Sequence, residues 1–221
     1  PNVKVETYEK EERQRLQKNF GYSFEDLKRI IPMANNGMEA TKAMGKDTPL
    51  AVLSDRTHPL FNYFKQLFAQ VTNPPIDSIR EKVVTSTTVY LGTEGNILEE
   101  KAENCKQLRI NDPILTNTDL LKIKNMNVEG FKVETIPIIY YKNTSLERAI
   151  DHLFVEVDRA HREGANIIIL SDRGVDENHV AIPSLLAVAA LQQYLVQTKK
   201  RTSMAVILES GEPRDVHHFA A

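Results

Sequence analysis

One run of the chain, Ile167 to Leu170, contains apolar residues without interruption, and three of the four are β-branched. A half-exposed strand alternates apolar and polar positions, whereas an unbroken run rich in β-branched residues is typical of a strand covered on both faces. The run ends in the polar sequence Ser171-Asp172-Arg173-Gly174. Loops at the carboxyl ends of strands hold ligands and catalytic groups in many α/β proteins. The pattern therefore predicts a buried central strand, followed either by a solvated loop or by a functional one.

Similar units lie on both sides of this strand. Apolar runs at 136–141 and 204–208 predict two more strands. Pro137 indicates either that the first of these strands starts there or that it lies at a sheet edge. A capping box at Thr144 to Glu147 precedes an amphipathic helix that Gly164 ends, and an apolar helix spans Ser184 to Gln197. Because βα crossovers are right-handed, these repeated units predict an α/β fold with a parallel sheet or a rudimentary, partial β/α barrel.

The first half of the chain reads as more irregular and mainly helical. Residues 1–22 are interpreted as a charged lead-in segment, and 23–221 as the domain. Ser23 is a predicted N-cap of a short helix that Pro32 should disturb, and Thr118 is the predicted cap of a later helix. Cys105 is interpreted as a small buried residue. Further predicted elements are helices at 59–71, 78–83 and 116–123 and strands at 85–92 and 104–110.

Composition limits the classes of function. The 221 residues are 41% hydrophobic and 26% charged, with a net charge of −2, so the balance favours neither a nucleic-acid partner nor an anionic membrane. No apolar run approaches the roughly 20 residues that a membrane helix needs. The single cysteine excludes an internal disulfide, and an iron–sulfur cluster held by this chain alone. We expect a cytoplasmic protein, and the ends at Pro1 and Ala221 suggest a C-terminally truncated piece of a longer polypeptide.

Polar residues near the predicted strand ends are the candidates for chemistry. His179, His217 and His218 with nearby acids match no metal-binding spacing, so no metal site and no catalytic residue are predicted. Loops containing Arg173-Gly174 and Ser210-Gly211 could hold a phosphate, although neighbouring acids would repel it. The strand-end candidates are Asp172, Arg173, Gly174, Glu209, Ser210 and Gly211.

Several long strings resemble one known family. They are Met44-Gly45-Lys46-Asp47-Thr48-Pro49-Leu50-Ala51-Val52-Leu53-Ser54, Phe68-Ala69-Gln70-Val71-Thr72-Asn73-Pro74-Pro75-Ile76-Asp77-Ser78-Ile79-Arg80-Glu81, Leu170-Ser171-Asp172-Arg173-Gly174-Val175-Asp176, Ile182-Pro183-Ser184-Leu185-Leu186-Ala187-Val188 and Glu209-Ser210-Gly211-Glu212-Pro213-Arg214-Asp215-Val216-His217-His218-Phe219-Ala220. Together they are similar to the central domain of the glutamate synthase large subunit, and they cover nearly everything from Gly21 onward.

This resemblance implies a role between two reaction centres. Glutamate synthases convert glutamine and 2-oxoglutarate to two glutamates, using an amidotransferase domain, an ammonia tunnel, FMN and an iron–sulfur cluster. The resemblance places these cofactors outside this chain, which would link the amidotransferase and FMN-binding domains of the same polypeptide. The residues matching the family's tunnel and inter-domain loops are Met44, Gly45, Lys46, Asp47, Thr48, Val71, Thr72, Asn73, Pro74, Pro75, Ile76 and Asp77.

Two other functions stay open at this point. One is an independent barrel-type enzyme, or a domain that binds a phosphate ligand, with the loops 172–174 and 209–212 at its site. The other is a separate binding module for proteins of glutamine metabolism. The sequence does not indicate whether the parent enzyme takes electrons from ferredoxin, NADH or NADPH.

Overall fold

A computed structural model describes residues 7–37, 51–64 and 74–221. The chain divides into two compact units, and each is considered by itself. The sheet unit comprises Asp77–Ile182 and Ala187–Ser210, together with the described residue Thr7. The helical unit comprises the described residues between Tyr8 and Ile76, together with Pro183–Leu186 and Gly211–Ala221.

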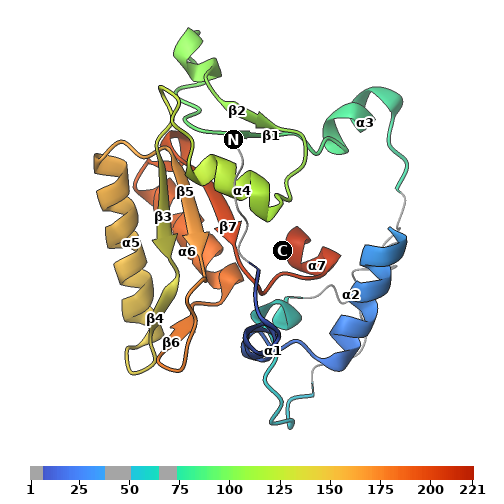
Figure 1. The fold of residues 1–221 in the computed structure, drawn as a ribbon. Coiled ribbons are helices and arrows are strands. Elements are labelled where there is room, and N and C mark those ends of the chain that lie inside the picture. Colours follow the sequence, from blue (N-terminus) through green and yellow to red (C-terminus); the bar gives the residue numbers. More distant parts are fainter. Residues whose placement is uncertain (1–6, 38–50, 65–73) are drawn as a thin grey trace. The chain divides into compact units, whose positions relative to one another are not determined.

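A three-stranded parallel sheet forms the centre of the sheet unit (Figure 1). Its strands β3 (Val133–Pro137), β5 (Ile167–Ser171) and β7 (Ala205–Glu209) lie in the order β3-β5-β7. Helix α5 (Leu146–Arg162) connects the first two strands, and α6 (Ser184–Gln197) with the short η3 (Arg201–Ser203) precedes the third. The predicted α/β class, the parallel sheet and the buried central strand are thereby confirmed.

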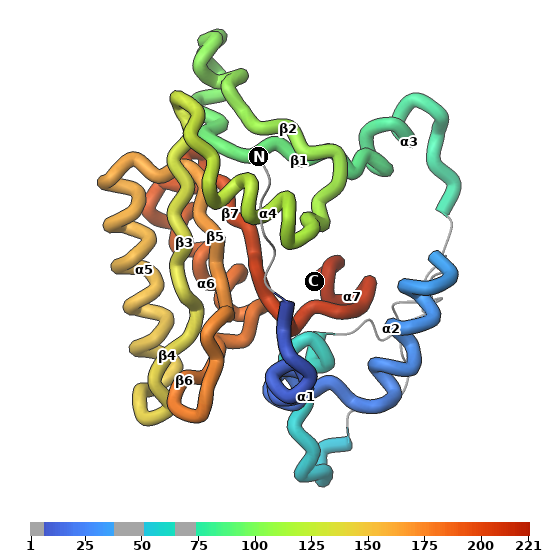
Figure 2. Tube along the Cα trace, in the orientation of Figure 1, coloured from blue at the N-terminus to red at the C-terminus, as the bar shows by residue number. Residues whose placement is uncertain are grey.

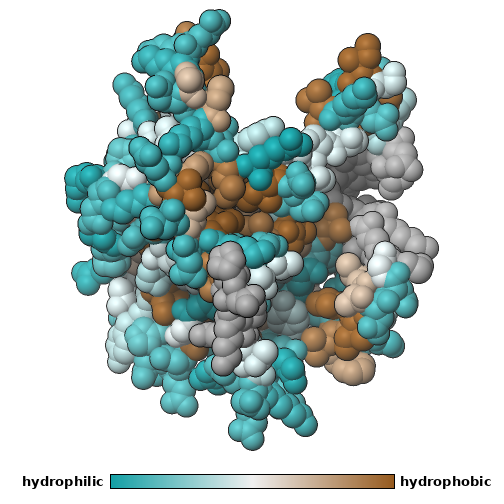
Figure 3. All heavy atoms as spheres, turned by 45° about the horizontal axis from the view of Figure 1, so that its top comes forward, coloured by the Kyte–Doolittle hydropathy of each residue, from teal (hydrophilic) through white to brown (hydrophobic). Residues whose placement is uncertain are grey.

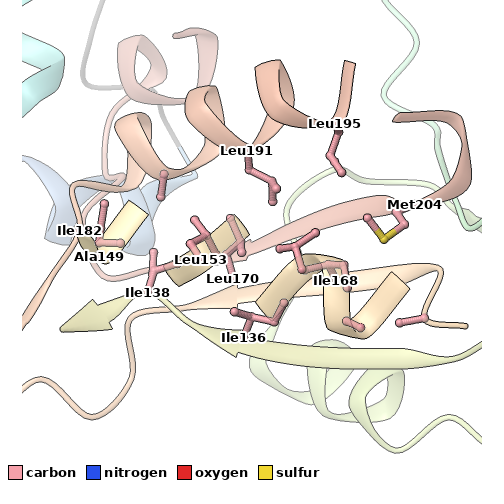
Figure 4. Packing of buried hydrophobic residues seen from close by; sticks show 14 residues of the cluster. Ile136, Ile138, Ala149, Leu153, Ile168, Leu170, Ile182, Leu191, Leu195 and Met204 are labelled. Atoms are coloured by element: carbon pink, nitrogen blue, oxygen red, sulfur yellow. The ribbon is translucent and has the colours of Figure 1, made fainter. Parts of the chain in front are cut away.

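Both faces of β5 are covered, which explains why its sequence does not alternate. Ile168 and Leu170 belong to one apolar cluster with residues of α5 and α6, including Leu153 and Leu191 (Figure 4). Ile167 and Ile169 belong to a second cluster on the other face. That face is covered by helix α4 (Asn117–Lys124) and by an antiparallel pair, β1 (Val89–Leu91) with β2 (Leu108–Ile110).

The predicted strand at 136–141 is divided in the structure. Pro137 is the last residue of the edge strand β3, so the predicted edge position is correct and the predicted start is wrong. After Ile138 the chain forms β4 (Ile139–Tyr141), which pairs antiparallel with β6 (His179–Ala181). The pattern gave no sign of β6, because a three-residue strand is too short for a recognisable alternation.

Two predicted caps shift by one or two residues. Ser145, not Thr144, caps α5 by accepting a hydrogen bond from the backbone N of Arg148. Thr116, not Thr118, caps α4 in the same way. In both cases the cap is the last residue with extended backbone, whose hydroxyl reaches the amide three residues later.

The described part of the helical unit contains four short helices: α1 (Lys10–Asn19), α2 (Phe24–Asn36), η1 (Leu60–Tyr63) and α7 (Val216–Ala220). Figure 2 follows the chain through α1 and α2. The predicted cap Ser23 is confirmed, with Asp26 completing a reciprocal capping box. Pro32 does not end α2, which continues to Gly37, whose positive φ of 60° closes the helix.

Two further predictions are wrong. The helix predicted at 59–71 is only the 3₁₀ turn η1 in its described part, where Phe64 already lies outside the helix and is exposed. Residues 65–71 of that prediction lie outside the described residues. Cys105 is exposed at the end of the 3₁₀ turn η2 (Ala102–Cys105), and of the strand predicted at 104–110 only Leu108–Ile110 forms a strand. The predicted helix at 78–83 is confirmed as α3 (Ser78–Val84).

Candidate functional site

The carboxyl ends of β5 and β7 bring Ser171, Asp172 and Glu209 together, as expected for neighbouring parallel strands. The hydroxyl of Ser171 donates to Glu209 Oε2 at 2.6 Å. The backbone N of Asp172 donates to the backbone O of Glu209 at 3.1 Å, and the Asp172 side chain is buried. These bonds extend the strand pairing beyond the sheet and fix the position of the Glu209 carboxylate.

Two cations neutralise this carboxylate. Lys124 Nζ, in the last turn of α4, lies 2.8 Å from Glu209 Oε2, and Arg173 Nε lies 3.5 Å from Oε1. Burial raises the pKa of Glu209, but the hydrogen bonds from Lys124 and Ser171 and the charges of Lys124 and Arg173 outweigh it and lower the pKa overall. Glu209 therefore stays ionised at neutral pH, which suits an ion pair better than a general acid.

The loop after β5 is built to make a turn. Gly174 has a φ of +94°, a conformation that residues with a side chain rarely adopt. The backbone N of Arg173 donates to Ser171 Oγ at 3.3 Å. Since Arg173 already faces Glu209, a phosphate bound to it would lie close to a carboxylate. Phosphate binding at this loop stays a prediction.

The loop after β7 is part of the helical unit from Gly211 onward. The hydroxyl of Tyr22 donates to Gly211 O at 2.9 Å. A Cβ added at Gly211 would lie 2.8 Å from ring atoms of Phe20, so the aromatic ring approaches the backbone more closely than any other residue type would permit. Glu212 Oε2 accepts from the backbone N and the hydroxyl of Ser184, at 2.7 and 2.6 Å, and so caps the start of α6.

Arg214 contacts three residues of the N-terminal segment, and the sequence analysis assigned it no role. Its side chain is 5% exposed, and its Nη2 donates to the backbone O of Phe20 at 2.6 Å. The guanidinium lies 3.8 Å from the centre of the Tyr22 ring, and Nη1 lies 3.8 Å from Asp26 Oδ2. Arg214 thus holds together segments that are 194 residues apart in the sequence. The fold alone creates this arrangement, and no local pattern signals it.

The histidines considered as ligands are engaged in other contacts. His217 Nε2 donates to the backbone O of Phe61 at 3.0 Å. His218 stacks on the Phe61 ring with centroids 4.3 Å apart, and its Nδ1 accepts from the backbone N of Arg214 at 3.1 Å. His179 Nδ1 lies 2.9 Å from Asp176 Oδ1. Within the described ranges, no group of three or more His, Cys, Asp or Glu side chains is placed to hold a metal ion.

Comparison with known proteins decides the family. A family model described as the glutamate synthase central domain matches residues 15–221. This chain belongs to the glutamate synthase central domain family.

Curated relatives of this chain are also glutamate synthases. The central domain is similar to the glutamate synthase [NADPH] large chain of Bacillus subtilis, with 45% identity over 93% of this chain. It is similar to glutamate synthase [NADH] of Schizosaccharomyces pombe, with 43% identity over 90%, and to ferredoxin-dependent glutamate synthase 2 of Synechocystis, with 41% over 91%. The chain spans only 13%, 10% and 13% of these three relatives, respectively.

The two predicted tunnel loops of this central domain are only partly described. Met44–Thr48 and Val71–Asn73 lie outside the described residues. Pro74, Pro75 and Ile76 are exposed and form no helix or strand. Asp77 caps α3, where its Oδ1 accepts from the backbone N atoms of Ile79 and Arg80 at 3.1 and 2.8 Å. The tunnel assignment of these loops therefore stays a prediction. No helix in the described ranges has the length and apolar character needed to span a membrane.

Proposed function

We propose that this chain is the non-catalytic linking domain of a glutamate synthase large subunit. It scaffolds the amidotransferase and FMN-binding domains of the same polypeptide, in the cytoplasm. The observation that carries this proposal is the family match over residues 15–221, combined with relatives in which the matching part is only 10–13% of the length. FMN and the iron–sulfur cluster belong to other parts of the polypeptide.

The polar groups at the strand ends support a scaffold. Glu209 is held in an ion pair with Lys124, and Glu212 caps a helix. These carboxylates stabilise the fold, and a catalytic acid or base needs a group that is free to exchange a proton with substrate. The Arg214 contacts keep distant segments of the helical unit in one arrangement, as a linking domain requires.

We further propose that the loops 44–48 and 71–77 help to form the wall of the ammonia tunnel. A wall of this kind must keep its shape while a small neutral molecule passes. Two consecutive prolines, Pro74 and Pro75, restrict the backbone of the second loop. Thr72 offers a hydroxyl as a hydrogen-bond partner, without a charge that would retain ammonium.

The source of electrons differs among the relatives, whose names specify NADPH, NADH and ferredoxin. All three types match this chain to a similar extent, between 41% and 45% identity. The choice of electron donor is therefore made by parts of the polypeptide other than this domain.

The test is a Thr72→Val variant in the full-length large subunit. We expect glutaminase activity to persist while glutamate formation falls and free ammonia is released, because the change removes the hydroxyl and keeps the shape. Thr57→Val, at an exposed threonine outside both loops, is the matched control and should leave the ratio of the two activities unchanged.

An unchanged ratio in Thr72→Val would refute the tunnel role. The linking role is tested separately on the purified chain, which we expect to be colourless and without glutaminase activity. Bound flavin or glutamine hydrolysis by the chain alone would instead support an independent enzyme that uses the strand-end loops.

A further inference from the structure

Two adjacent aliphatic side chains in the sheet unit are almost fully exposed. Ile97 and Leu98 are 84% and 87% exposed, in a loop that precedes η2. Single exposed aliphatic residues are normal on protein surfaces. Figure 3 shows apolar residues, coloured brown, among the hydrophilic residues of one face of the molecule. Two neighbouring exposed aliphatic side chains form a small apolar patch in contact with water. Exposed apolar patches are characteristic of surfaces that bind another protein.

The loop that presents this pair is fixed by side-chain hydrogen bonds. Asn104 Nδ2 donates to the backbone O atoms of Asn96 and Glu99, at 2.9 Å each. Asn96 Oδ1 accepts from the backbone N of Leu98 at 3.1 Å, and Asn96 Nδ2 donates to Glu99 Oε1 at 3.0 Å. A flexible surface loop would not need these bonds. They fix the backbone that carries the two side chains before any partner binds.

Gly95 makes this arrangement possible. Its φ is +67°, and a Cβ at this position would lie 2.1 Å from Asn104 Oδ1. The backbone N atoms of Glu94 and Gly95 also donate to the backbone O of Thr202, at 2.8 and 3.3 Å, which fixes the loop to the segment before β7. The exposed pair is therefore attached rigidly to the sheet unit, and rigidity lowers the entropy lost on binding.

Acidic residues flank the pair in the sequence. Glu94, Glu99, Glu100 and Glu103 lie within a few residues of it, and Lys101 and Lys106 are the nearby cations. Lys101 pairs with Glu99, and Glu94 lies 3.7 Å from Arg201. The residues flanking the pair in sequence thus carry more negative than positive charge. A complementary surface would offer an apolar pocket with lysine or arginine at its edge.

We propose that Ile97 and Leu98 form a docking knob that inserts into such a pocket on another domain of the same polypeptide. This inference rests on the proposed function, because the matching part is only 10–13% of the length of the relatives and most of their polypeptide lies elsewhere. A second copy of this chain is a poorer occupant. In a two-fold contact through this pair, the acidic residues near Ile97 and Leu98 of one copy would face those of the other. Like charges across an interface oppose association.

The test places a photo-crosslinking residue, p-benzoylphenylalanine, at position 97 of the full-length large subunit. We expect an intramolecular crosslink to a peptide outside residues 1–221 that contains lysine or arginine. The matched control has the same residue at Val155, which is 60% exposed on α5, and should give no such crosslink. A crosslink to a second copy, or none at all, would overturn the proposal.

Two second-site variants test the mechanism with the same probe. Leu98→Ser should lower the crosslink yield about tenfold, because burial of one aliphatic side chain is worth at least about one power of ten in affinity. Asn104→Ala, which leaves both aliphatic residues in place, should lower the yield by releasing the loop. Unchanged yields in both variants would refute the knob. The crosslink measures whether position 97 contacts another domain, whereas Thr72→Val measures the coupling of the glutaminase and synthase activities. Either proposal can therefore fail without the other.

Discussion

Each of the two units of the chain is stabilised by a different kind of contact. In the sheet unit, aliphatic side chains from β5, α5 and α6 form a continuous buried core. In the helical unit, α1, α2 and α7 contain no buried residue, and Phe61 is the buried apolar side chain of its described part. Polar contacts of Arg214, Glu212 and the two adjacent histidines take the place of a core. Loss of side-chain volume should therefore destabilise the sheet unit. Loss of charge or a change of pH should destabilise the helical unit.

The largest effect is expected from Leu153→Ala in the sheet unit. Leu153 is 2% exposed on α5 and belongs to the same cluster as Ile168 and Leu170. Removing a buried leucine side chain leaves a cavity and costs about 2–5 kcal/mol of the free energy of unfolding. Urea denaturation of the purified chain measures this cost. Val155→Ala, on the exposed side of the same helix, should change the stability by less than about 0.5 kcal/mol.

An intermediate and local effect is expected from Arg214→Met in the helical unit. Methionine keeps most of the aliphatic volume but removes the bond to Phe20, the contact with the Tyr22 ring and the charge facing Asp26. We expect a loss of about 1–3 kcal/mol, confined to this unit. Hydrogen–deuterium exchange should rise about fivefold or more for amides near Phe20, because 1 kcal/mol corresponds to about a factor of five.

The control for this variant is Arg15→Met, which removes an exposed pair with Glu12 at 3.8 Å and should have almost no effect. Exchange in β5 should not change in either variant. If Arg214→Met accelerated exchange in β5 as much as near Phe20, the two units would share one stabilising core and the comparison would be wrong.

The same difference explains what the sequence could predict. Ile167 to Leu170 predicted β5 because burial on both faces leaves a local signature, and the apolar face around Leu153 predicted α5 for the same reason. Arg214 left no local signature, because its partners lie in a segment almost 200 residues away. At the strand ends, the position of Glu209 followed from the fold class. Its partner Lys124 did not, since the packing of α4 on the sheet is a tertiary property.

The smallest effect concerns acidification of the helical unit. Burial lowers the pKa of His218, while Asp215 and Glu212 raise it and Arg214 and His217 lower it, so the folded value lies below the ordinary 6.5. Protonation would also put a proton on Nδ1, which now accepts from the backbone N of Arg214. The unfolded chain therefore binds the proton more readily, and stability present above pH 6.5 is lost as the pH falls through the folded pKa.

His218→Phe tests this effect, because phenylalanine can still stack on Phe61 but does not titrate. Between pH 6.5 and 4.5, we expect the protection of amides near Phe20, measured relative to the intrinsic exchange rate at each pH, to fall in the unmodified chain and much less in the variant, with a difference below about 1 kcal/mol, the scale of one hydrogen bond. In the sheet unit, Glu209 has a pKa lowered from an ordinary 4.5, so its contribution is lost only at lower pH, as the carboxylate takes up a proton. On acidification, the helical unit should therefore loosen before the strand ends of β5 and β7 do. The opposite order, or an equal loss of protection in His218→Phe, would show that His218 does not control the acid response of the helical unit.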